Sequence, residues 1–243
     1  MKIDLYTYTN KGSREINEDS FRIKTDGGGR CIAVLCDGLG GHDCGEVASA
    51  FAAEKTIEAL GKMDSLEQEK ILGVLGSVND GLIELQSQKE SYNGMRTTAV
   101  GCIVGDETVH SFNCGDSRFY YFSNGKLSTM SKDHSIPQMS VDLGEMTFDD
   151  IRGDADRNKL LKVMGQPTEG GAGTVYEPIK HKKGDAFLLC SDGFWEYVIE
   201  EEMEIDLSKS TTCKEWIEYM LVRLLLRRNP DNDNFTVVSG IIG

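Results

Sequence analysis

The sequence lacks an excess of basic residues, because 26 lysines and arginines stand against 40 aspartates and glutamates, a formal net charge of −14. A protein that binds nucleic acid needs a basic surface that displaces counterions from phosphates, so we expect no nucleic-acid partner. The chain also has no long uncharged apolar run, so we expect no membrane partner. A Walker-type loop, rich in glycine and followed by Lys and Ser or Thr, is missing too, which disfavours nucleotide hydrolysis.

Cysteine occurs seven times, but no paired Cys-x-x-Cys motifs or regular spacing indicate a zinc site or a disulfide framework. The N-terminal residues MKIDLYTYTN alternate as a strand does and lack the charged and apolar regions of a secretory signal. We therefore expect a reducing, cytoplasmic location. With four prolines and 39% hydrophobic residues, the composition is typical of a globular protein.

Hydrophobic periodicity predicts seven strand regions and three long helices. The strand regions are residues 2–9, 31–37, 97–105, 108–114, 118–127, 185–192 and 235–242. Turn residues at 104–109 and 122–127 predict two hairpins. The first helix is expected to be capped by Asp43, with Glu46 at the third position, and to reach Leu60. The second extends from near Ser65 to Leu85, and the third from Thr212, with Glu215 at its third position, to Arg228.

The order of these elements favours an α+β fold with antiparallel sheets. Strands cluster and helices pair, whereas a doubly wound parallel sheet needs strict alternation of the two. We expect a single domain spanning residues 1–243, because β-rich domains of this size are often single. The pattern weakens over about 135–178, which predicts an insertion with one short helix at DRNKLLKVMG, residues 156–165.

Several aspartates stand at the edges of the predicted strands. They are Asp19, Asp37, Asp116, Asp192 and Asp233. Taken singly, each is more simply interpreted as a turn or cap residue. Taken together, carboxylates beside buried strand ends are costly unless a cation meets them, because burial and mutual repulsion disfavour their charged forms. Hard divalent ions such as Mg²⁺ and Mn²⁺ prefer these oxygen ligands.

Seven stretches carry a resemblance to a known family. They are GSREINED (12–19), CDGLGGHDCGEVAS (36–49), RTTAV (96–100), NCGDSRFYYFSNGKLSTMSKDHS (113–135), DRNKLLKVMG (156–165), LLCSDGFWEYV (188–198) and DNFTVV (233–238). In this order they resemble the motifs of the protein phosphatase 2C family of metal-dependent serine/threonine phosphatases, and most closely those of its short bacterial members. Seven motifs in order over nearly the whole chain form a specific signal.

The resemblance implies a central antiparallel β-sandwich flanked by pairs of antiparallel helices, a four-layer αββα fold. It also implies a centre of two Mn²⁺ or Mg²⁺ ions at one end, with a third ion held more loosely. Asp37 matches the carboxylate that bridges the two ions, and Gly38 matches the residue that offers a backbone carbonyl. The other implied metal-site residues are Asp192 and Asp233 as direct ligands, Glu18 and Asp19 mostly through water, and Asp116 at the third ion.

The implied reaction is hydrolysis of phosphoserine and phosphothreonine. Two ions that share a hydroxide supply a nucleophile at neutral pH for in-line attack on phosphorus. Arg14 matches the arginine that binds the phosphate, and its planar fork suits two phosphate oxygens. Some family members carry a histidine after the Asp-Gly pair as general acid, but this chain has Leu39 there. The acid is then either His42 or a water molecule.

Two departures from the family pattern concern specificity. Arg96 stands where glycine usually precedes the paired threonines, and GDADRN replaces the usual His-Pro before DRN. The second change leaves the substrate preference open.

Two other functions are alternatives, a pseudophosphatase that only binds phosphoproteins and a metal-dependent hydrolase of small phosphoesters. Expected partners are phosphoserine and phosphothreonine proteins, including a serine/threonine kinase and its targets.

Overall fold

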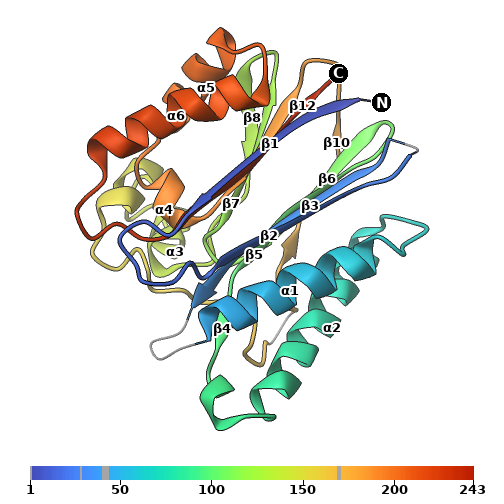
Figure 1. Ribbon diagram of the computed structural model, residues 1–243, viewed down its shortest axis with the longest axis vertical. Coiled ribbons are helices and arrows are strands. Elements are labelled where there is room, and N and C mark those ends of the chain that lie inside the picture. Colours follow the sequence, from blue (N-terminus) through green and yellow to red (C-terminus); the bar gives the residue numbers. More distant parts are fainter. Residues whose placement is uncertain (1, 28, 40–43, 169–170) are drawn as a thin grey trace.

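The computed structural model describes residues 2–27, 29–39, 44–168 and 171–243. Two antiparallel sheets pack face to face in it (Figure 1). One sheet contains, in spatial order, β1 (Ile3–Asn10), β12 (Phe235–Ile242), β11 (Ala186–Cys190), β7 (Arg118–Ser123) and β8 (Lys126–Met130). The other contains β10 (Ile179–Lys180), β6 (Thr108–Cys114), β5 (Ala99–Val104), β3 (Cys31–Leu39) and β2 (Asp19–Thr25), with β9 (Thr174–Val175) beside β6 and β4 (Arg96–Thr97) beside β3.

Helices cover both outer faces, which gives the four-layer αββα arrangement that the family resemblance implies (Figure 1). The long helices α1 (Gly45–Leu60) and α2 (Gln68–Gln86) cover the sheet that contains β3. The helices α4 (Asp192–Trp195), α5 (Glu200–Lys209) and α6 (Cys213–Arg227) cover the sheet that contains β11. The expected fold class is confirmed.

Three apolar clusters correspond to the three interfaces between layers. One joins α1 and α2 to their sheet, one joins α5 and α6 to theirs, and the third fills the space between the sheets. Alternate residues of β3 supply two of these clusters, since Val34 faces α1 and Leu35 faces the opposite sheet. A strand buried on both faces is continuously apolar, which explains the run that precedes Asp37.

The predicted short helix at 156–165 is wrong. The region contains instead α3 (Ile136–Asp142) and a 3₁₀ helix, η2 (Phe148–Gly153), and a further 3₁₀ turn, η1 (Glu90–Tyr92), follows α2. The backbone of 156–165 bonds to distant segments: Leu161 N–H donates to the His134 carbonyl at 2.7 Å, and Met164 N–H donates to the Thr97 carbonyl at 2.8 Å. These long-range bonds replace the local ones that a helix requires.

The helix starts differ in part from the expectation. Thr212 caps α6 as predicted, because its hydroxyl accepts the Glu215 N–H at 3.2 Å. At α1 the cap position is Cys44, with φ 139° and no capping bond from its side chain, so the expected capping box is wrong. Asp43 itself lies outside the described residues. Both predicted hairpins, β5–β6 and β7–β8, are present.

Candidate functional site

Asp37 and Asp19 face each other across neighbouring strands. Asp19 begins β2, Asp37 lies near the end of β3, and the antiparallel register places the two residues directly opposite each other. Thr98 fixes the backbone of Asp37 on the other side: Asp37 N–H donates to Thr98 Oγ1 at 2.9 Å, and Thr98 N–H donates to the Asp37 carbonyl at 2.8 Å. The strand end that carries Asp37 is therefore held by bonds on both edges.

Ser191 joins the two sheets beside these carboxylates. Its hydroxyl donates to Asp19 Oδ2 at 2.8 Å and accepts the Thr236 N–H at 2.9 Å, so residues from β2, the end of β11 and β12 meet at one atom. Asp192 follows directly as the first residue of α4. Asp233 stands two residues before β12. Carboxylates from both sheets are thus brought to the same end of the sandwich.

Asn234 holds the loop that carries the N-terminal motif. Its side-chain amide donates to the carbonyls of Lys11 and Ile16 at 2.9 and 3.0 Å, and its Oδ1 accepts the Glu18 N–H at 2.8 Å. Asn234 is buried, so this three-point contact is protected from water. Asn234 and Ser191 lie inside the motifs but are not predicted as site residues, because their partners in the structure are far away in the sequence.

Gly38 permits a close approach between β3 and the start of α1. A Cβ at Gly38 would lie 2.3 Å from the Gly45 carbonyl oxygen, and one at Gly45 would lie 2.6 Å from Glu18 Oε1. The Gly38 N–H also donates to the Glu18 carbonyl at 3.1 Å. Both glycines are therefore required by space, and Glu18 lies against them.

Asp116 occupies the tight connection between β6 and β7. Its side chain is 4% exposed, and the preceding Gly115 adopts φ 100°, a conformation that favours glycine. The indole of Trp195 in α4 donates to the Asp116 carbonyl at 2.9 Å. Asp116 is therefore attached to the helix that Asp192 begins.

The pKa values show that these carboxylates interact. Burial raises the pKa of Asp37 well above its usual range, and the charges of Asp19, Asp192, Asp116 and Asp233 add to this. Burial and the charge of Asp116 likewise raise the pKa of Asp192. Burial, then repulsion by Asp233 and Glu18, raises the pKa of Asp19 to about 6. For Asp116, burial and the nearby Asp133 raise the pKa to about 7.

The site fits a hard divalent cation. All the side chains that meet here offer oxygen, and Asp19 Oδ1 is a buried acceptor without a hydrogen-bond partner among the described residues. A bound cation would satisfy this atom and relieve the mutual repulsion. Over the described ranges, no group of three His, Cys, Asp or Glu side chains forms a ready-made ligand set by itself. Waters and backbone carbonyls must then complete the coordination, as Mg²⁺ commonly requires.

Arg14 lines a polar cavity of about 370 Å³ at this end of the sandwich. Its Nη2 lies 2.7 Å from Asp233 Oδ2, and Asp192 lines the same cavity. Arg157 and Glu196 face the cavity too and form an ion pair with each other at 2.5 Å. Sequence reasoning did not select Arg157, although it lies within DRNKLLKVMG, because nothing local places that stretch beside Asp192.

Two other sequence expectations concern neighbouring positions. His42, a candidate general acid, lies outside the described residues. Arg96, the residue that departs from the family pattern, is exposed in β4 and pairs with Leu39 across the strand. The local change therefore lies on the surface beside the end of β3.

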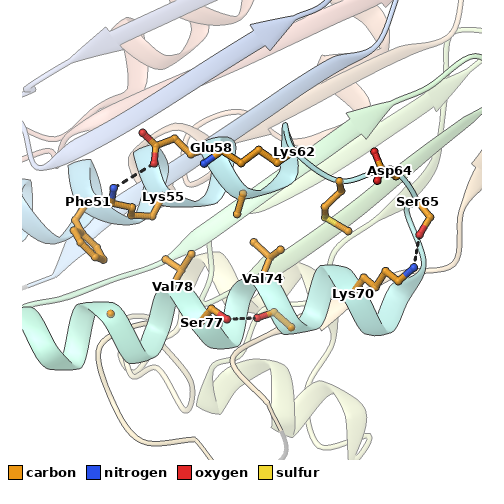
Figure 2. A pocket seen from close by; sticks show the side chains of 14 residues that line it. Phe51, Lys55, Glu58, Lys62, Asp64, Ser65, Lys70, Val74, Ser77 and Val78 are labelled. Atoms are coloured by element: carbon orange, nitrogen blue, oxygen red, sulfur yellow. Dashed lines mark hydrogen bonds and ion pairs between the residues drawn. The ribbon is translucent and has the colours of Figure 1, made fainter.

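A separate cavity of about 860 Å³ lies elsewhere, in the groove between α1 and α2. Figure 2 shows Val74 and Val78 of α2 pointing toward α1, where Phe51 projects into the same groove. Lysines and acidic residues alternate along its rim, and Lys55 pairs with Glu58 at 3.2 Å. Because the rim charges nearly balance, the groove does not favour a ligand of either charge. None of the clustered aspartates lines it.

Comparisons with known proteins agree with this architecture. The family model of protein phosphatase 2C matches residues 9–228. The serine/threonine phosphatase Stp of Listeria monocytogenes is 30% identical over 93% of this chain and 90% of its own length. The crystal structure of serine/threonine phosphatase Stp1 from Staphylococcus aureus is similar with a TM-score of 0.88, at 27% identity, covering 100% of this chain and 96% of that one.

A third structure is the catalytic domain of the serine/threonine protein phosphatase PstP, solved in complex with two manganese ions. Its similarity has a TM-score of 0.77 at 24% identity and covers 99% of each chain. At this identity the likeness shows a shared fold.

Proposed function

Because the chain belongs to the protein phosphatase 2C family, we propose that it is a metal-dependent phosphatase that hydrolyses phosphoserine and phosphothreonine in proteins. The observation that carries the proposal is the convergence of carboxylates from both sheets, whose pKa values are raised by burial and mutual repulsion. A surplus of buried negative charge at one point is stable only with protons or cations. Bound cations would neutralise the clustered carboxylates and so stabilise this arrangement.

We propose Mn²⁺ or Mg²⁺ as the cofactor, with two principal ions and a third held more weakly. Asp37 would contact both principal ions, with Asp192, Asp233 and the Gly38 carbonyl completing the direct ligands. Glu18 and Asp19 would act mostly through water, and Asp116 would serve the third ion. The raised pKa values and the buried, unpartnered Asp19 Oδ1 support this assignment.

The chain's own residues would then bind and orient the phosphoryl group. Two divalent ions, when bound, activate water for in-line attack on phosphorus. Arg14 would hold phosphate oxygens with its guanidinium, and its place in the polar cavity beside Asp192 and Asp233 supports this role. Asn234 would keep the Arg14 loop in position. The leaving alkoxide would receive its proton from either His42 or water.

Turnover of a phosphothreonine peptide, compared with turnover of a nucleotide, tests the proposal. We expect the peptide to be hydrolysed with Mn²⁺ and no turnover in chelator, because the described site offers oxygen ligands for a hard cation. Preference for the nucleotide would favour the small-phosphoester alternative. Tight binding of the phosphopeptide without turnover would favour a pseudophosphatase, an alternative that the complete set of expected carboxylates disfavours.

Broader assignments are also proposals. We propose that residues 1–243 act as one catalytic domain, with 135–178 as an insertion beside the site, and that a serine/threonine kinase and its targets are partners. A cytoplasmic location is supported by seven cysteines that are all buried and unpaired. Among the described residues, none of the helices has the length and apolar character that a membrane crossing requires.

A further inference from the structure

We propose that His134 is a positioning residue that fixes the orientation of Asp116 by holding both backbone polar groups of Gly115. The His134 N–H donates to the Gly115 carbonyl at 2.9 Å, and the Gly115 N–H donates to His134 Nδ1 at 3.1 Å. One residue thus engages both backbone polar groups of the glycine that precedes Asp116, and the Gly115 carbonyl accepts a longer bond from Asn113 Nδ2 at 3.4 Å as well. This inference rests on the proposed function, in which Asp116 serves a third ion.

Gly115 needs such a restraint because glycine in a left-handed conformation has little intrinsic stiffness. Its φ is 100°, and a Cβ there would lie 2.6 Å from Thr98 Cγ2, so no other residue can replace it without strain. The Asp116 side chain leaves the backbone at the next Cα atom. A small rotation at Gly115 would therefore move the carboxylate away from the position beside Asp192.

The geometry also defines the state of the imidazole. A backbone N–H can only donate, so Nδ1 of His134 must be the unprotonated acceptor. The hydrogen is then on Nε2, which donates to Thr174 Oγ1 at 2.9 Å. Burial, followed by the charge of Lys162, lowers the pKa of His134 to about 4, which agrees with a neutral ring. Both ring nitrogens are thus engaged in defined directions.

His134 connects Asp116 to the insertion as well. Thr174 belongs to β9 near the end of the insertion, and the His134 carbonyl accepts the Leu161 N–H at 2.7 Å. Trp195 restrains the other side of the turn through the Asp116 carbonyl. The turn is therefore held on one side by His134, which contacts the insertion, and on the other side by Trp195 of α4.

The test compares His134→Asn with His134→Gln, two amides of which only one replaces Nδ1. Asparagine places an acceptor at the Nδ1 position, whereas glutamine reaches the Nε2 position and leaves the Gly115 N–H without its partner. Hydrogen exchange of the Gly115 amide reports the contact without metal or substrate. We expect protection in wild type and His134→Asn, and about a tenfold loss of protection in His134→Gln, the size of one hydrogen bond.

The functional readout is binding of Mn²⁺ by calorimetry, together with kcat and KM for a phosphothreonine peptide. In His134→Gln we expect the weakest Mn²⁺ site to lose about tenfold in affinity. The tighter sites and KM should stay unchanged while kcat falls. Thr174→Val is the matched control: it removes only the Nε2 contact and should resemble wild type in both measurements.

Equal behaviour of the asparagine and glutamine variants, in exchange or in Mn²⁺ binding, would overturn the inference. Circular dichroism tests whether both variants are folded. If His134→Gln fails to fold, His134→Asn alone decides: wild-type Mn²⁺ binding and Gly115 amide protection in that variant support the inference, and their loss contradicts it. Failure of the proposed function looks different. Wild type would then not hydrolyse the peptide, while the exchange difference at Gly115 would remain.

Discussion

Two neighbouring groups of buried charge differ in whether the chain neutralises them. In the first, Arg118 is fully buried, bonds to both oxygens of Asp133 at 2.9 and 2.7 Å, and stacks on Trp195 at 3.6 Å. Arg152 and Glu200 extend this paired network at 2.7 Å. In the second, the aspartates around Asp37 repel one another. Opposite charges within the chain indicate a structural role, whereas uncompensated like charges indicate a place for an external cation.

The largest expected effect comes from removing one charge from the aspartates around Asp37, which repel one another. Asp37→Asn keeps the shape but removes the charge, so we expect turnover to fall by about a thousandfold, since several kcal/mol of charge stabilisation correspond to that factor. In chelator the same variant should be at least as stable as wild type, because repulsion and burial cost both decrease. Peptide hydrolysis and urea unfolding measure the two quantities. If Asp37→Asn were less stable than wild type in chelator, the charge of Asp37 would not be destabilising in the metal-free protein, contrary to our expectation.

The paired group should respond in the opposite way. Arg118→Met leaves Asp133 buried without its partner, and we expect a loss of about 3–5 kcal/mol in the free energy of unfolding, with or without metal. Adding Asp133→Leu should recover part of this loss, because no lone charge then remains. Urea denaturation of the single and double variants measures the difference. Equal stability of wild type and the single variant would show that the pair is unimportant.

Arg14 links the cluster to the cavity and should have a moderate effect. A charged hydrogen bond is worth about 1.5–3 kcal/mol, so Arg14→Ala should lower kcat/KM by about tenfold to a hundredfold and raise KM. Lysine there should rescue only partly. The ion pair with Asp233 is largely exposed, so its loss should change metal affinity little. Kinetics and calorimetry separate these effects, and weakened Mn²⁺ binding would contradict the proposed division of roles.

The last expected effect is confined to the metal-free protein, whose stability should depend on pH. Asp19 and Asp116 have pKa values raised to about 6 and about 7 in the folded state, against a usual value of 3.8. The folded protein therefore binds more protons than the unfolded chain in the interval from about pH 4 to 7, and its stability falls as pH rises through that interval. Mn²⁺ should remove this loss, because it replaces the protons.

Urea midpoints measured in chelator across this pH interval test the prediction. The double variant Asp19→Asn with Asp116→Asn should show a smaller slope than wild type. A wild-type stability that rises with pH over the same interval would contradict the assignment of raised pKa values.

Much of the fold follows from local pattern. The continuous apolar run before Asp37 and the helical spacing of α2 and α6 are visible in the sequence, and all three elements are present. The missed helix α5 is different, because its buried Glu202 and Asp206 depend on Arg223 of α6 for their partners. No pattern within α5 reveals that compensation. The edge strand β2, only half-buried over most of its length, was missed for lack of a clear apolar face.

The candidate site was foreseeable in its residues but not in its connections. The motifs point to Asp37, Asp192 and Asp233, whose roles remain predictions. Nothing in the order of residues indicates that Ser191 contacts Asp19, 172 positions away. Likewise the helix expected at 156–165 fails because Thr97 and His134 take its backbone bonds. Contacts of this kind are decided by the whole fold and not by neighbours in sequence.

The pairing of the first and last strands has a consequence for biosynthesis. β12 lies between β1 and β11, with Ile3 opposite Ile242, and the two ends meet side by side in Figure 1. A ribosome that has released β1 through β11 has therefore made a sheet with a gap, and the gap is filled only when β12 emerges. Asp233 and Asn234 arrive with that strand. A nascent chain therefore cannot assemble the proposed site before β12 and the residues just ahead of it have emerged from the ribosome.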